Sequence, residues 1–258
     1  MDFPHSLAFF ALDNLSRTVG VPKVSLGTFG AYGLVNNLIS FPIIGGWLGG
    51  ALFGYRYFTE AYRDRIVEII VEDSSGDLHT GTGFFLRSVD GLSRVITCKH
   101  NLVEDDGNRR KIQSISAGEQ TFNVISGAIC KNLDAAIITV DGVFTLDLPN
   151  AEPNLLDTIY SAGFPRIFLT EKSPLLFHKG EINGFSGSFD NGSIAIVVST
   201  DVAPGNSGGP VFDSVGRVVA MVVRRVETQS LTGMAKYVLA IPISAIMRSF
   251  NENLVEPF

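Results

Sequence analysis

The sequence predicts an all-β domain over residues 66–250. After Arg65, short runs of β-branched and aromatic residues alternate with clusters of Gly, Asn, Asp and Pro. Runs at this spacing are typical of a β-sandwich or β-barrel rather than of alternating βα units. The candidate strands are Ile66–Glu72, Thr82–Arg87, Arg94–Cys98, Ala135–Val140, Ile194–Ser199 and Arg217–Val223.

Composition limits the classes of function. The 258 residues allow one large domain or two modest ones. The net charge is −6 and no run of Lys or Arg occurs, so we expect no nucleic-acid partner. The two cysteines, Cys98 and Cys130, lack the spacing of metal ligands, so we expect no metal site. We also expect no cofactor. So few cysteines favour an intracellular protein, either cytoplasmic or membrane-associated.

Residues 1–65 differ from the rest and predict an apolar helical segment. Apolar residues near the start follow helical spacing, which indicates a short amphipathic helix. Asp2, the missing basic region and the lack of a clear cleavage site argue against a signal peptide. Residues 57–65 are expected to form an exposed helical linker.

A long uncharged stretch lies within this segment. No charged residue occurs from Val24 to Tyr55, and Gly33–Gly54 is long enough to cross a bilayer. Glycines at every fourth position would let two helices approach closely in a membrane. Asparagine, serine and proline interrupt the apolar run, however. Two interpretations of residues 24–55 therefore stay open: a membrane-associated segment, and a helical hairpin packed on the β domain.

The clearest chemical motif is the loop Thr200–Phe212, which carries Ser207 between small residues. Gly205 can adopt the positive φ that side chains disfavour. The backbone N–H groups of Gly205 and Ser207 can then point to the same side and hold a developing oxyanion. By itself the motif is also compatible with an ordinary glycine-rich turn between strands.

A serine nucleophile needs a base and a group that orients the base. His100 follows an apolar strand that ends at a loop, which would place a base at the edge of a barrel. The other histidines, His5, His79 and His178, have no such setting. Asp134 directly precedes the apolar run Ala-Ala-Ile-Ile, so its carboxylate can be held against an imidazole N–H.

The order His100, Asp134, Ser207 is that of the chymotrypsin-type triad. The chain resembles the trypsin-like serine peptidases over about residues 66–250, and most closely their HtrA (Deg)-like and glutamyl-endopeptidase-like bacterial branches. The resemblance is carried by the motifs Gly81–Phe85, Ile96–His100, Leu133–Ala136, Gly163–Pro165 and Pro204–Pro210.

The resemblance implies two six-stranded antiparallel barrels of chymotrypsin type, over about residues 66–145 and 155–242, followed by a short helix at about 243–253. It implies a serine endopeptidase acting on a protein or peptide substrate. Ser207 would attack the peptide carbonyl, His100 would act as base and then acid, and Asp134 would orient His100. Gly205 and Ser207 would bind the oxyanion. The alternative is a catalytically silent domain that binds peptides or scaffolds a complex.

The chain departs from the family pattern around His100 and after the β domain. Lys99 replaces the usual alanine before the histidine, Cys98 is expected to be a buried structural thiol, and no PDZ-like module follows the β domain.

The residues of the specificity pocket leave the substrate preference open. Asp201, six residues before Ser207, would favour basic substrates. The other pocket candidates are Val222, Val223 and Arg224. Arg224 and the adjacent Arg225 would instead attract acidic side chains, and a preference for small or aliphatic residues also stays open, as does the oligomeric state.

Overall fold

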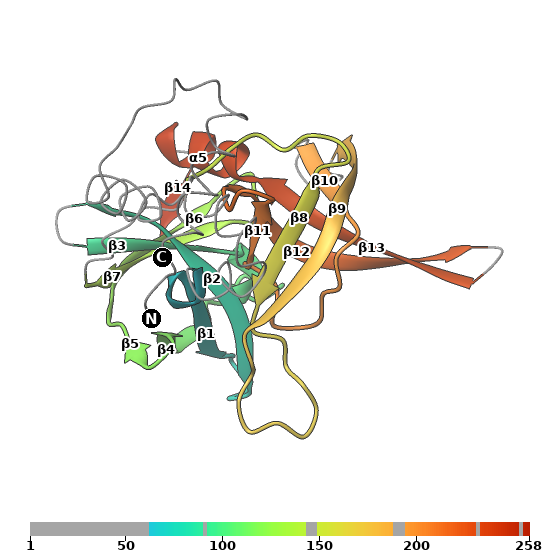
Figure 1. Cartoon of the computed structure of the whole chain (residues 1–258). Coiled ribbons are helices and arrows are strands. Elements are labelled where there is room, and N and C mark those ends of the chain that lie inside the picture. Colours follow the sequence, from blue (N-terminus) through green and yellow to red (C-terminus); the bar gives the residue numbers. More distant parts are fainter. Residues whose placement is uncertain (1–61, 90–91, 143–148, 188–193, 231–232, 253–254) are drawn as a thin grey trace, which may run out of the picture.

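The computed structural model describes residues 62–258, except for 90–91, 143–148, 188–193, 231–232 and 253–254. Most of the expected N-terminal segment, including residues 24–55, therefore lies outside the described residues. Within them, the chain forms two antiparallel sheets, and all strands of the first sheet except the C-terminal one precede those of the second (Figure 1). No helix of the described residues combines the length and apolar content needed to span a membrane.

The first sheet contains eight strands in the order β14-β6-β7-β3-β2-β1-β4-β5. Six are longer and two are short, namely β5 and the C-terminal β14, which pairs with the edge strand β6. The expected six strands are therefore present and the chain end extends their sheet. The bounds are β1 Ile66–Glu72, β2 Leu78–Val89, β3 Leu92–Thr97, β4 Lys111–Ala117, β5 Gln120–Thr121, β6 Val124–Cys130, β7 Ala136–Asp141 and β14 Val255–Pro257.

The second sheet closes into a six-stranded barrel in the order β10-β13-β12-β11-β8-β9, as predicted. Its strands β12 and β13 continue beyond the barrel as a long two-stranded ribbon (Figure 1). The predicted boundary at residues 145–154 falls between β7 and β8. The bounds are β8 Thr158–Gly163, β9 Leu176–Gly187, β10 Ile194–Val198, β11 Pro210–Asp213, β12 Val218–Ser230 and β13 Gly233–Pro242.

Three buried apolar clusters hold this arrangement together. One includes Ile69 and Ile138 inside the first sheet, and another includes Ile196 and Val211 inside the barrel. The third cluster lies between the first sheet and the barrel, because it contains Phe84 of β2 together with residues of β11, β12 and the C-terminal helix. The first sheet and the barrel are called the two units below. Burial of apolar surface between the units fixes the loops of one sheet against the loops of the other.

The helix α5, Ile243–Asn251, confirms the predicted C-terminal helix and buries Ile246 in the cluster between the units. The expectation of an exposed linker at residues 57–65 is wrong for Tyr62, which is 1% exposed. Its ring packs on Phe212 with 5.1 Å between centroids, because burying an aromatic ring against the barrel is favourable. A short 3-10 helix, Arg63–Arg65, then leads into β1.

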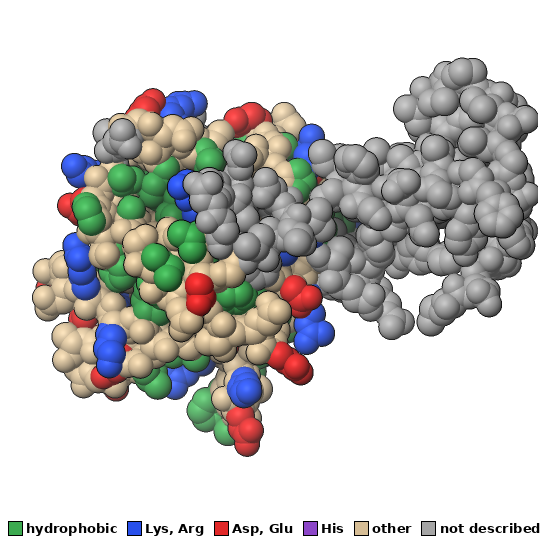
Figure 2. Space-filling model, turned by 90° about the vertical axis from the view of Figure 1, so that its left-hand side faces the viewer, with side chains coloured by type: hydrophobic (Ala, Val, Ile, Leu, Met, Phe, Trp, Pro, Cys, Tyr) green, Lys and Arg blue, Asp and Glu red, His purple; other side chains and the backbone are tan. Residues whose placement is uncertain are grey.

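Figure 2 shows one face of the molecule. In its described part, side chains of Lys and Arg are interspersed with those of Asp and Glu and with apolar groups. No extended basic surface is visible on that part of the face.

Candidate active site

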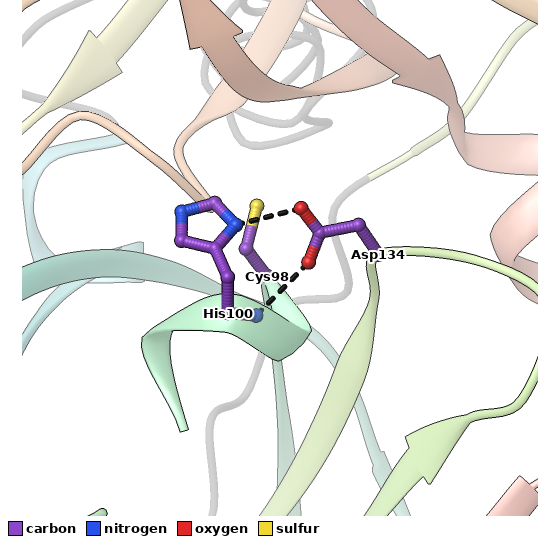
Figure 3. A group of neighbouring side chains, drawn as sticks. All are labelled: Cys98, His100 and Asp134. Atoms are coloured by element: carbon purple, nitrogen blue, oxygen red, sulfur yellow. Dashed lines mark hydrogen bonds and ion pairs between the residues drawn. The ribbon is translucent and has the colours of Figure 1, made fainter. Parts of the chain in front are cut away.

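His100 and Asp134 meet because their strands are neighbours. β3 pairs with β7 so that Thr97 lies opposite Ala136, which brings the residues after β3 close to those before β7. His100 lies in the 3-10 helix η2, Lys99–Asn101, directly after β3. Its Nδ1 is 2.6 Å from Oδ2 of Asp134, and its backbone N–H donates to Oδ1 at 2.9 Å (Figure 3).

The carboxyl group of Asp134 is kept ionised by these contacts. Burial would raise its pKa, but the hydrogen bond and charge of His100, the His100 backbone N–H and the charge of Arg224 together lower it. An ionised Asp134 makes Nδ1 of His100 the protonated ring nitrogen, because a carboxylate can only accept. Nε2, which points away from Asp134 in Figure 3, then carries the lone pair. A base of this kind can accept a proton from a hydroxyl.

Ser207 is held between the two units by its carbonyl group. This oxygen accepts hydrogen bonds from the backbone N–H of Thr82 and from Nδ2 of Asn101, both at 2.9 Å. Both donors belong to the first sheet and its loops. The hydroxyl of Ser207 donates to the backbone oxygen of Val223 on β12 at 2.8 Å. Sequence reasoning did not assign a role to Asn101, although it directly follows His100.

The backbone of Gly205 requires glycine. Its φ is +103°, and an added Cβ would lie 2.3 Å from the carbonyl oxygen of Phe164. Its own carbonyl oxygen accepts a hydrogen bond of 2.6 Å from the hydroxyl of Thr82, which also accepts the backbone N–H of Phe164 at 2.9 Å. Within the described chain, the backbone N–H groups of Gly205 and Ser207 donate to no protein atom. Two unpaired donors beside a serine hydroxyl suit a developing negative charge.

Cys98 lies against the same pair and is fully buried. Burial raises its pKa, and the charge of Asp134 adds to this effect. Its thiol donates to the backbone oxygen of Val222 at 3.3 Å. The sulfur, one ring nitrogen of His100 and one carboxylate oxygen of Asp134 all lie within 4.8 Å of one another (Figure 3). No metal-ligand spacing is visible in the sequence here, because strand pairing rather than chain proximity brings Asp134 to the other two residues.

Of the predicted pocket residues, Asp201 lines a hollow that Val222, Val223 and Arg224 do not line. Asp201 lines a hollow of about 290 Å³. Val222 and Val223 are buried at 1% and 7% exposure, and the charge of Arg224 acts on Asp134. The other residues lining the hollow are His178, Lys179, Ser199, Thr200, Arg225 and Val238. Among them, His178 and Lys179 had no sequence signal for this role, because β9 was not predicted.

A larger hollow of about 810 Å³ lies under the loop between β8 and β9, and none of His100, Asp134 and Ser207 lines it. The loop exposes three consecutive apolar side chains at its tip. Ile167 is 39% exposed, Phe168 87% and Leu169 90%. The larger hollow is therefore not the place where His100, Asp134 and Ser207 would act on a substrate.

The sequence of this chain is similar to that of a known family. Residues 81–221 match the family model of the trypsin-like peptidase domain. A curated relative, the probable periplasmic serine endoprotease DegP-like of Pseudomonas savastanoi pv. phaseolicola, is 30% identical over 178 residues. That match covers 67% of this chain but 34% of the relative, so the chain spans about a third of that protein's length.

Solved structures agree at the level of the fold. The active form of the Rv3671c protease from M. tuberculosis superposes with a TM-score of 0.59 and 20% identity, covering 75% of this chain and 82% of that one. The serine endoprotease from Yersinia pestis gives 0.56 and 17% identity, with 78% and 66% covered. The overall backbone fold is therefore shared across very different sequences.

Proposed function

Because the chain belongs to the trypsin-like peptidase family, we propose that it is a serine endopeptidase that uses Ser207, His100 and Asp134. The observation that carries the proposal is the 2.6 Å contact between His100 Nδ1 and Asp134 Oδ2 beside the Ser207 loop. That contact leaves Nε2 of His100 as the acceptor for the serine proton.

The reaction follows from these positions. The hydroxyl of Ser207 turns from Val223 to Nε2 of His100, transfers its proton and attacks the peptide carbonyl. The N–H groups of Gly205 and Ser207 receive the oxyanion, an interaction worth about 3–4 kcal/mol per donor in comparable sites. His100 then returns the proton to the leaving amine, and water releases the acyl group by the same steps.

One contact favours a second candidate, a peptide-binding domain without catalysis. The Ser207 hydroxyl bonds Val223 rather than His100, as a non-reactive serine would. Hydrolysis of an unfolded protein by the full chain separates the two candidates. A peptidase loses hydrolysis in both Ser207→Ala and His100→Ala but retains peptide binding. A binding domain shows binding and no hydrolysis in any of the three proteins.

We also propose that the chain associates with a membrane through residues 24–55. The loop tip Ile167–Leu169 supports this, because it exposes apolar side chains and shares the larger hollow with Arg63, at the start of the described chain. Exposed apolar groups of this kind partition into a bilayer interface. Flotation of the full chain with anionic vesicles tests the association. Recovery of the protein away from the vesicles would contradict it.

A further inference from the structure

A thiol, an imidazole and a carboxylate, all of which can bind metal ions, lie close together at the proposed base. Cys98 and His100 are two residues apart on the segment that leaves β3, and Asp134 arrives from the loop before β7. Their sulfur, nitrogen and oxygen atoms lie within 4.8 Å of one another. Figure 3 shows the sulfur on the side of the imidazole that faces the carboxylate.

This donor set suits zinc. Zinc accepts thiolate, imidazole and carboxylate, and three protein ligands leave a fourth position for water. A tetrahedral zinc ion holds such atoms about 3.3–3.7 Å apart. The cluster therefore needs to contract by about 1 Å at its widest separation, while the His100–Asp134 contact opens slightly. Thiolate and imidazole also disfavour magnesium and calcium, which prefer oxygen ligands.

Solvent can reach the cluster from one side. The side chains of His100 and Asp134 are 41% and 32% exposed, whereas Cys98 is buried beneath them. An ion can therefore meet the imidazole and carboxylate first, and the thiol then completes the site from below. Cys130, the second free thiol, is also buried but is not a member of the cluster, which makes it a matched control.

We propose that a zinc ion binds Cys98, His100 and Asp134 and reversibly inhibits the peptidase; the inhibition rests on the proposed function, and the binding does not. The ion replaces the Nδ1 proton of His100, which moves to Nε2, and the Cys98 thiol releases its proton to water. One proton is released per ion bound. With Nε2 protonated, His100 cannot accept the proton of Ser207, so acylation stops.

Cobalt(II) tests the binding without any assay of activity, because a cobalt–thiolate bond gives a near-ultraviolet charge-transfer band. The full chain, reduced and free of metal, is titrated with cobalt and then with zinc. The native protein and Cys130→Ala should show the band, and zinc should remove it. Cys98→Ala should show no band and bind zinc at least about 100-fold more weakly. An equal band in Cys98→Ala, or none in the native protein, would overturn the site.

Inhibition is measured separately, with each protein compared to its own zinc-free activity. Zinc should reduce fluorophosphonate labelling at least tenfold in the native protein and in Cys130→Ala, and a chelator should restore it. Cys98→Ala should keep its labelling at the same zinc concentration. Circular dichroism checks the fold, and Cys98→Ser serves if the alanine variant does not fold. Equal inhibition in the Cys98 variants would refute the regulatory role even where the cobalt band is present.

Discussion

The hydroxyl of Ser207 donates its hydrogen bond to the backbone oxygen of Val223 at 2.8 Å, and within the described residues no hydrogen bond joins it to His100. The proposed nucleophile is therefore paired with β12 before substrate arrives. Losing one such hydrogen bond costs about 1 kcal/mol, which is small beside a catalytic barrier, and a new bond to His100 offsets the loss. Attack requires only that the side chain turn toward Nε2.

Thr82 is a positioning residue for the Ser207 loop. Its hydroxyl links the carbonyl of Gly205 to the N–H of Phe164. In Thr82→Val both partners stay buried without that link, which should lower the free energy of unfolding by about 1–3 kcal/mol. We expect kcat to fall at least tenfold with little change in KM, because the Gly205 peptide loses its anchor. Thr82→Ser should restore most of kcat. A Thr82→Val enzyme with kcat within twofold of native would contradict this role.

Gly205 and Gly184 make a matched pair of alanine substitutions. At Gly205 the added Cβ meets the oxygen of Phe164 at 2.3 Å, and φ is +103°; at Gly184 nothing lies within 4 Å. The positive φ alone costs about 1–2 kcal/mol. Gly205→Ala should therefore lower kcat/KM at least 100-fold, whereas Gly184→Ala should change it less than threefold. Steady-state kinetics of both variants provide the measurement, and equal effects would show that the Gly205 geometry does not matter.

Stability should decline in acid because several carboxyl groups have lowered pKa values in the folded protein. Asp73 owes its lowered pKa first to the hydroxyl of Ser75 and then to His79, and Asp141 owes its own to Asn123. A group with a lowered folded pKa stabilises the fold above its unfolded pKa and loses that contribution as pH falls through the folded pKa. The urea midpoint should therefore be constant near neutrality and fall from about pH 4 downward.

Asp141→Asn provides the control for this pH dependence. Its amide cannot ionise, so the urea midpoint of the variant should depend less steeply on pH in the acid range than that of the native protein. A variant with the native slope would show that Asp141 does not contribute to the acid dependence.

The hollow around Asp201 predicts a preference for acidic substrate side chains. Arg225, His178 and Lys179 share this hollow with the single carboxylate, although Arg225 is also ion-paired with Glu227 at 2.9 Å. Arg225→Ala should reduce cleavage after Glu relative to Lys by about fivefold, equivalent to about 1 kcal/mol for one exposed charge. Asp201→Asn should shift the ratio the other way. Peptide-library cleavage profiles measure both, and cleavage after Lys and Arg in the native enzyme would refute the preference.

The fold class was predictable from the sequence because the core strands of both sheets are strongly apolar. The predicted strand Ile66–Glu72 coincides with β1. In contrast, β9 escaped prediction because it mixes His178, Lys179 and Glu181 with apolar residues and exposes much of its length. Its contribution to the Asp201 hollow was missed for the same reason.

The candidate site was partly predictable. Ser207, His100 and Asp134 each had a local signal at a loop beside an apolar run. The proximity of Asp134 to Cys98 depended on the register that sets Thr97 opposite Ala136. The register between two strands cannot be inferred from the sequence of either strand alone. The hydrogen bond from Ser207 to Val223 likewise arises only when the loop and β12 are packed together.

Covalent labelling by a fluorophosphonate, followed by mass spectrometry of the labelled peptide, tests the central proposal most directly. The native full chain, free of metal, should carry one adduct on Ser207. His100→Ala should label at least 1000-fold more slowly, and Ser207→Ala should not label. A native chain that is folded but unlabelled, or an adduct that persists in Ser207→Ala, would contradict the assignment of Ser207 as the nucleophile.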